Sequence, residues 1–186
     1  MTASILFVCR ANLCRSPSAE VMLTRALAGA HTEAQVTSAG MEVVAGQVPP
    51  DDFVDLALIR GIDLRAHEPS PFTAELAQSC DLVLTMTRGL LRTMVLSAPP
   101  IWPRSFTLLE LVRRGTTSEP PHEGDTLATW LARVHTSRDR AELISLDPID
   151  DLRDPMVDAT ESNEEMFGEL ERATRRLARL IAAVSG

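Results

Sequence analysis

The chain has 186 residues, 45% of them hydrophobic and 24% charged, which is typical of one globular domain with a single core. Its formal net charge of −8 argues against nucleic acid and anionic membrane surfaces as partners, because both carry negative charge themselves. The chain enters its first predicted strand by residue 5 and has no apolar run long enough to cross a bilayer, so neither a signal peptide nor membrane insertion is expected.

The first predicted element is a strand over residues 5–8, an unbroken apolar run typical of a strand buried on both faces of a parallel sheet. A helix is predicted from Pro17, because proline suits the first helical position and small or apolar residues then recur on one face up to Ala30. Residues 9–15 therefore form a strand-to-helix loop. Amide groups of such a loop and the N-terminus of the following helix together favour a bound anion.

The side chains of this loop are suited to nucleophilic attack on an oxyanion. Cys9 opens the loop and is predicted to be the nucleophile, because the positive field there favours a thiolate. Arg15 closes the loop and offers a planar pair of donors to a tetrahedral oxyanion. We expect the Ser16 hydroxyl to donate to the Cys9 thiolate, and Asn12 to support a left-handed turn.

At this point the sequence resembles a known family. The run Val8-Cys9-Arg10-Ala11-Asn12-Leu13-Cys14-Arg15-Ser16-Pro17 is similar to the signature of the low-molecular-weight protein tyrosine phosphatases. The resemblance implies a protein-tyrosine phosphatase that acts through a phosphocysteine, with Cys9 and Arg15 as catalytic residues. The predicted substrate-binding residues are Arg10, Ala11, Asn12, Leu13, Cys14 and Ser16. The implied partner is a phosphotyrosine-containing protein, with a bacterial tyrosine kinase or a polysaccharide-export protein as candidates.

Two residues outside the loop also match the family. The second predicted strand spans residues 35–40, and Ser38 lies near its end. His67 follows a later Gly-Ile segment. By the resemblance, Ser38 and His67 join Asn12 in a polar network that supports the phosphate-binding loop. The family usually has glycine where Ala11 stands, so the backbone at Ala11 must avoid conformations that penalise a Cβ atom.

Helices and strands then alternate along the chain. The pattern predicts a helix capped by Asp51 or Asp52 and ending at Gly61, a short helix over 73–78, a strand over 81–86, a helix around 90–95 and a strand over 104–107. Such alternation implies parallel strands joined by right-handed crossovers. We therefore predict a single domain over residues 1–186. Its fold is three-layer α/β, a four-stranded parallel open sheet with helices on both faces and ligands at the carboxyl ends of the strands.

Residues 108–146 are longer than the family usually needs and are predicted to be a helical insertion. Residues 108–113 look helical, 115–124 look like a loop, and Asp125 can cap a helix over 127–134. Two interpretations stay open for this segment. It covers one face of the sheet, or it forms a lid or partner surface beside the site.

The predicted general acid comes near the end of the chain. The family carries this acid in an Asp-Pro pair shortly before its last helix, and two such pairs begin at Asp147 and Asp154. Asp154 is preferred, because it lies closer to the final helix, whose start is marked by a capping box of Ser162 and Glu165.

Neither a metal nor another cofactor is predicted. His122 and His135 do not fall at a metal-ligand spacing with each other or with a cysteine. The loop amides and Arg15 supply the positive charge that other phosphoryl-transfer sites obtain from cations. Three cysteines suit a reducing cytoplasm better than a disulfide framework, although Cys9 and Cys14 are candidates for a reversible, protective disulfide.

Three other activities stay open. Phosphoarginine phosphatases tend to have threonine where Leu13 stands. Thiol-dependent arsenate reductases usually have Ser-Gln in place of Ser16-Pro17 and further cysteines after the third strand, whereas Cys80 precedes that strand here. A non-catalytic phosphoprotein-binding module would lose Cys9 or the acid, and both are present.

The predicted cleft lacks aromatic residues that the family commonly has. Val44 stands where a tryptophan often follows the second strand, and Met156 and Val157 follow the Asp-Pro pair. Ring packing normally contributes to phosphotyrosine recognition. The sequence therefore determines the reaction type better than it determines the substrate.

Overall fold

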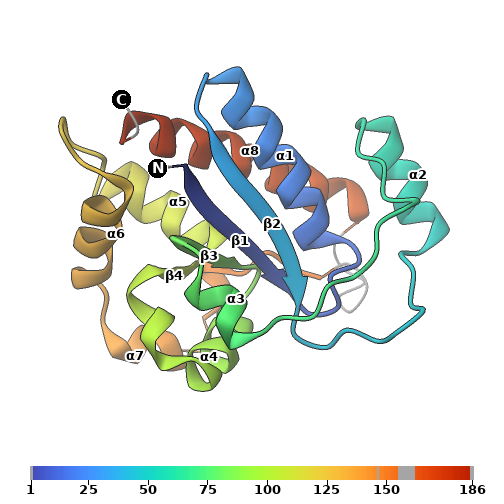
Figure 1. The fold of residues 1–186 in the computed structure, drawn as a ribbon, viewed down its shortest axis with the longest axis horizontal. Helices are drawn as coiled ribbons and strands as arrows, with labels where there is room; N and C mark the ends of the chain where they lie inside the picture. Colours follow the sequence, from blue (N-terminus) through green and yellow to red (C-terminus); the bar gives the residue numbers. More distant parts are fainter. Residues whose placement is uncertain (1, 146, 155–161, 185–186) are drawn as a thin grey trace.

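The computed structural model describes residues 2–145, 147–154 and 162–184. Four parallel strands form one sheet in the order β2-β1-β3-β4 (Figure 1). They are β1 (Ala3–Cys9), β2 (Ala34–Gly40), β3 (Leu82–Thr85) and β4 (Ser105–Thr107). The strand order reverses direction at β1, so Cys9 ends a strand at the switch point where ligands of open α/β sheets bind.

Side chains of β1 alternate between two apolar cores, one on each face of the sheet. Ile5 and Phe7 belong to one core, Leu6 and Val8 to the other, and all four are fully buried. One face carries α1 (Arg15–Gly29), α2 (Asp51–Ile59), α5 (Leu108–Thr117), α6 (Leu127–Thr136) and α8 (Asn163–Ala183). The other carries α3 (Ala74–Gln78), α4 (Arg88–Ser97) and the 3-10 helix η1 (Pro99–Arg104). The predicted three-layer α/β fold is confirmed.

Local sequence signals mark two helix ends correctly. The capping box predicted for the last helix is present, with Glu165 N donating to Ser162 Oγ at 3.2 Å and Ser162 N donating to Glu165 Oε2 at 2.9 Å. Gly61 follows α2 with a φ of +75°, the left-handed conformation that commonly ends a helix. Within the described residues, no helix is both long and apolar enough to span a membrane.

Some predicted helix starts differ from the observed ones by one or two residues, and α2 and α1 are examples. The N-cap of α2 is Pro50, and Asp51 and Asp52 lie in the first turn, where the helix dipole favours negative charge. Helix α1 begins at Arg15 instead of Pro17. Proline is tolerated within a first turn, because the N–H group that it lacks has no partner inside the helix there.

The segment after β4 differs most from its prediction. Helix α5 runs through Gly115 to Thr117, although residues 115–124 were expected to form a loop. A Cβ atom on Gly115 would lie 2.7 Å from the Trp130 ring. The glycine therefore allows α5 and α6 to pack closely, and it does not end the helix.

Two further features of this segment escape the sequence pattern. Helix α6 is capped by Thr126 in place of Asp125, whose carboxylate accepts two hydrogen bonds from Arg133. Helix α7 (Arg140–Ile144) and the 3-10 helix η2 (Pro148–Asp150) were not predicted. Helix α6 contacts α5 and η1, whereas α7 contacts α4, so the segment packs on both sides of the sheet near β4 (Figure 1). That it is an insertion relative to the family stays a prediction.

Candidate active site

The loop after β1 folds around the sulfur of Cys9. The backbone N–H of Asn12 lies 3.2 Å from Cys9 Sγ, and the Ser16 hydroxyl lies 3.0 Å from it, both as donors. Cys9 is buried, and Ser16 is fully enclosed in the first turn of α1. Hydrogen bonds of this kind stabilise sulfur in its anionic form.

Asn12 connects the loop to three neighbouring segments. It has a φ of +55°, the left-handed conformation expected from the sequence, and its side chain is completely buried. Its amide nitrogen donates to Ser16 Oγ and to Ser38 Oγ, each at 2.9 Å, and its Oδ1 accepts from Ser70 N at 2.8 Å. His67 Nε2 lies 2.6 Å from the Asn12 carbonyl oxygen. The contacts predicted among Asn12, Ser38 and His67 are therefore present.

The end of β2 lies directly against this loop. Parallel pairing continues past the strands, because Met41 N donates to the Cys9 carbonyl at 3.1 Å and Glu42 N donates to the Arg10 carbonyl at 2.7 Å. A Cβ atom on Gly40 would lie 2.8 Å from the backbone of both Ala11 and Asn12. Backbone atoms cannot turn aside as a flexible side chain can, so this position requires glycine.

We expect Gly40→Ala to destabilise the fold by about 1–3 kcal/mol and to weaken binding of inorganic phosphate, because the added methyl group pushes the loop away from the strand. Urea unfolding and calorimetric titration with phosphate measure the two effects. The matched control is Gly29→Ala, where the new Cβ atom meets nothing within 4 Å. Equal behaviour of the two variants would contradict the close approach.

Arg15 joins the start of α1 to a segment from the far end of the chain. Its side chain is buried, and it donates to the Leu152 carbonyl oxygen at 3.2 Å and forms an ion pair with Asp154. The Asp154 side chain is 22% exposed, so this ion pair lies at the boundary between the interior and the surface. Pro155, Met156 and Val157, which were also part of the sequence argument, lie outside the described residues.

A pocket of about 360 Å³ opens over the loop. It is lined by Cys9, Arg10, Ala11, Leu13, Cys14, Arg15, Glu42, Val44, Gln47, Val48, Pro50 and Asp154. Seven of these were predicted from the sequence. Asn12 and Ser16 are fully buried and do not line the pocket, and Ser38 and His67 contact Asn12. Asp147 instead caps η2 and is exposed. Among the described residues, none from 108–145 lines the pocket, which favours the interpretation of that segment as cover for the sheet.

Two ionisable side chains that line the pocket have shifted pKa values. Arg10 Nε donates to Glu42 at 2.6 Å on the exposed rim, and this contact raises the pKa of Arg10. Burial raises the pKa of the Cys14 thiol to about 12, so Cys14 stays protonated at neutral pH.

Within the described residues, no group of three or more His, Cys, Asp or Glu side chains is arranged to hold a metal ion. That the site requires no metal stays a prediction.

Several residues at this site were not found from the sequence. Glu42 on the rim, Ser70 on Asn12 and the carbonyl of Leu152 on Arg15 are brought in by the fold. A strand over residues 35–40 was predicted, but the close contact of its last residue, Gly40, with the loop was not. A backbone group that accepts a hydrogen bond leaves no signal in residue identity.

The chain is similar in sequence and in structure to known proteins. Residues 4–116 match the family described as "Low molecular weight phosphotyrosine protein phosphatase". Etp of Escherichia coli K12, a low molecular weight protein-tyrosine-phosphatase, is 26% identical over 96% of this chain and 95% of its own length. EpsP of Ralstonia solanacearum, a probable enzyme of the same kind, is 36% identical over 46% of this chain, and the match spans 57% of EpsP. The structure of the YwlE arginine phosphatase from Geobacillus stearothermophilus aligns with a TM-score of 0.64, at 26% identity, over 95% of this chain and 91% of YwlE.

Proposed function

Because this chain belongs to the low molecular weight phosphotyrosine protein phosphatase family, we propose that it hydrolyses phosphotyrosine in a protein through a phosphocysteine formed on Cys9. One observation carries the proposal. Cys9 Sγ accepts hydrogen bonds from Asn12 N and the Ser16 hydroxyl at the floor of a pocket whose wall includes Arg15 and Asp154. A nucleophile, an oxyanion-binding group and a proton donor therefore share one space.

The first step transfers the phosphoryl group to sulfur. The Cys9 thiolate attacks phosphorus in line with the phenolic oxygen of the substrate, so that an S–P bond forms as the P–O bond breaks. Amide groups of loop 10–15 and the Arg15 guanidinium hold the non-bridging oxygens, on which negative charge is spread. Asp154, in its protonated form, donates to the departing phenolate oxygen.

The second step releases phosphate. The Asp154 carboxylate removes a proton from a water molecule, which attacks phosphorus and breaks the S–P bond. The departing thiolate accepts the Ser16 hydroxyl hydrogen bond, so the leaving group is stabilised as it forms.

The ion pair between Arg15 and Asp154 changes when the substrate binds. The phosphate dianion takes the place of the Asp154 carboxylate on Arg15, and the Asp154 carboxyl group is then left facing the ester oxygen of the substrate.

The test uses the wild-type protein with three substrates. We expect it to hydrolyse a phosphotyrosine peptide and p-nitrophenyl phosphate, and acid quenching during turnover should capture an acid-stable phosphoenzyme on the peptide that contains Cys9. Arsenate with a thiol reductant should not be reduced. Arsenate reduction without ester hydrolysis would replace the proposal with the reductase alternative, and phosphopeptide binding without turnover would replace it with a binding module.

A phosphoarginine substrate is the second candidate, because the YwlE structure that this chain resembles is that of an arginine phosphatase. Leu13 is buried in the wall of the pocket, where its bulk favours an aromatic ring over a guanidinium. We expect Leu13→Thr to lower kcat/KM for the phosphotyrosine peptide by about 10-fold, since apolar contact with the ring is lost.

The matched control for Leu13→Thr is Leu13→Val, because valine has the shape of threonine but no hydroxyl group. Both variants should lose activity on the phosphotyrosine peptide. Only Leu13→Thr should raise kcat/KM for a phosphoarginine peptide relative to kcat/KM for the phosphotyrosine peptide. The measurement is the ratio of kcat/KM values for the two peptides. An unchanged ratio in Leu13→Thr would show that Leu13 does not select the substrate.

The partner and the location are part of the same proposal. The physiological substrate is a phosphotyrosine-containing protein, with a bacterial tyrosine kinase as the candidate that the family resemblance suggests. The reaction needs Cys9 as a free thiol, and Cys9, Cys14 and Cys80 are all free. A reducing cytoplasm keeps thiols in that state, so we place the protein there.

A further inference from the structure

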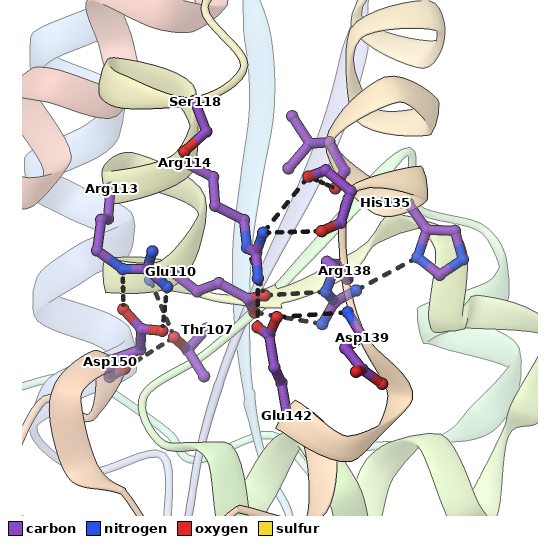
Figure 2. A network of polar contacts seen from close by, with 12 residues as sticks. Thr107, Glu110, Arg113, Arg114, Ser118, His135, Arg138, Asp139, Glu142 and Asp150 are labelled. Atoms are coloured by element: carbon purple, nitrogen blue, oxygen red, sulfur yellow. Dashed lines mark hydrogen bonds and ion pairs between the residues drawn. The ribbon is translucent and has the colours of Figure 1, made fainter.

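Asp150 is a buried carboxylate that lies outside the pocket. It is 1% exposed and ends η2, four residues before Asp154. Arg113 donates to both of its oxygens, Nε to Oδ1 at 2.8 Å and NH2 to Oδ2 at 2.7 Å, and Arg88 NH2 donates to Oδ2 at 3.0 Å (Figure 2 shows the Arg113 pair). Two guanidinium groups on one carboxylate fix both its position and the plane of its oxygens.

The backbone beside Asp150 is also held at the carboxyl ends of the strands. Thr107, the last residue of β4, donates its hydroxyl hydrogen to the Asp150 carbonyl oxygen at 2.7 Å. Leu152 N donates to the carbonyl oxygen of Met86, just after β3, at 2.8 Å. The Leu152 carbonyl in turn accepts a hydrogen bond from Arg15. The segment from Asp150 to Leu152 therefore connects the sheet to the guanidinium of the candidate site.

The helix that carries Arg113 is itself fixed by a network of charges, seen in Figure 2. Arg138 Nε donates to Glu110 Oε1 at 2.9 Å, and Arg114 pairs with both Glu110 and Glu142. These contacts join α5 to the segment that contains α6 and α7. Arg113 thus reaches Asp150 from a helix that these ion pairs hold against a neighbouring segment.

We propose that Asp150, held by Arg88 and Arg113, is a positioning residue that sets where the Asp154 carboxyl group meets the leaving oxygen of the substrate. The inference rests on the proposed function, because it assigns Asp154 the role of proton donor. A shift of Asp150 moves the two downstream groups that contact Arg15, the Leu152 carbonyl and the Asp154 carboxylate. Asp150 itself does not line the pocket.

The test compares two leaving groups in the variant Asp150→Asn. p-Nitrophenolate leaves readily without a proton, whereas phenolate needs one, so a misplaced acid affects phenyl phosphate more. We expect kcat/KM for phenyl phosphate to fall by about 10- to 100-fold, the loss that a displacement of about 1 Å can cause. The value for p-nitrophenyl phosphate should fall far less.

A second variant and a matched control separate positioning from stability. Arg113→Gln removes the bidentate contact with Asp150. The Arg113 side chain is 40% exposed, so this change disturbs folding less than a change at Asp150. The control is Asp125→Asn. Asp125 receives the same kind of paired contact from Arg133, at 3.0 and 2.7 Å, but lies at the start of α6 away from the pocket. Asp125→Asn should lower the unfolding temperature without changing the ratio of the kcat/KM values for phenyl phosphate and p-nitrophenyl phosphate.

The possible outcomes have distinct meanings. A selective loss on phenyl phosphate in Asp150→Asn and Arg113→Gln, absent in Asp125→Asn, supports the inference. An equal loss on both substrates, or no loss, overturns it while the wild-type activity keeps the proposed function intact. If Asp150→Asn does not fold, Arg113→Gln decides. A wild-type protein that hydrolyses neither ester removes the proposed function, and the positioning role falls with it.

Discussion

Replacing Cys9 with serine will abolish turnover of the phosphotyrosine peptide, lowering kcat by at least about 10⁴-fold, while inorganic phosphate still binds. A serine hydroxyl remains protonated at neutral pH and attacks phosphorus poorly. Arg15 and the loop keep their places, because the change replaces one atom and leaves the Asn12 and Ser16 contacts available. Steady-state kinetics and phosphate titration on the same preparation measure both effects.

The matched control is Cys80→Ser. Cys80 is also buried but belongs to the core on the opposite face of the sheet, where its thiol donates to the Leu76 carbonyl at 3.3 Å. Its loss should leave kcat within about twofold, since most changes far from a site alter only stability. Cys14 cannot replace the nucleophile, because burial raises its pKa to about 12. Hydrolysis that survives in Cys9→Ser would rule out the phosphocysteine mechanism.

The loop could be predicted from the sequence because its chemistry is local. Cys9, Asn12, Arg15 and Ser16 lie within eight positions of one another, and a strand followed by a helix fixes how they face. Asn12 adopts the left-handed turn that its short polar side chain favours. Ser38 was reached only through the family resemblance, since nothing in its own neighbourhood indicates a contact 26 positions away.

The unpredicted features depend on contacts between distant parts of the chain. Asp150 stands among other acidic residues, and only the fold shows that its carboxylate is buried against Arg88 and Arg113. Gly115 reads as a helix terminator by residue type, yet the Trp130 ring occupies the space that a side chain would need. In both cases the residue type had a common local explanation, and tertiary packing determined a different one.

Asp154→Asn should lower kcat/KM for phenyl phosphate by about 10²- to 10⁴-fold, because an amide cannot donate the proton that phenolate requires. The loss on p-nitrophenyl phosphate should be smaller. The same variant should bind inorganic phosphate several-fold more tightly. Arg15 pairs with the Asp154 carboxylate, and an amide at that position no longer competes with the phosphate dianion for the guanidinium.

This pair of opposite effects distinguishes a proton donor from a residue that merely holds the loop. A structural defect at Asp154 would release Arg15 from its place and weaken phosphate binding together with catalysis. The control is Asp147→Asn, at the other Asp-Pro pair, whose exposed side chain caps η2 through Ile149 N and should affect neither measurement. Weaker phosphate binding in Asp154→Asn would mean that the carboxylate supports Arg15 instead of competing for it. The acid would then have to be sought elsewhere around the pocket.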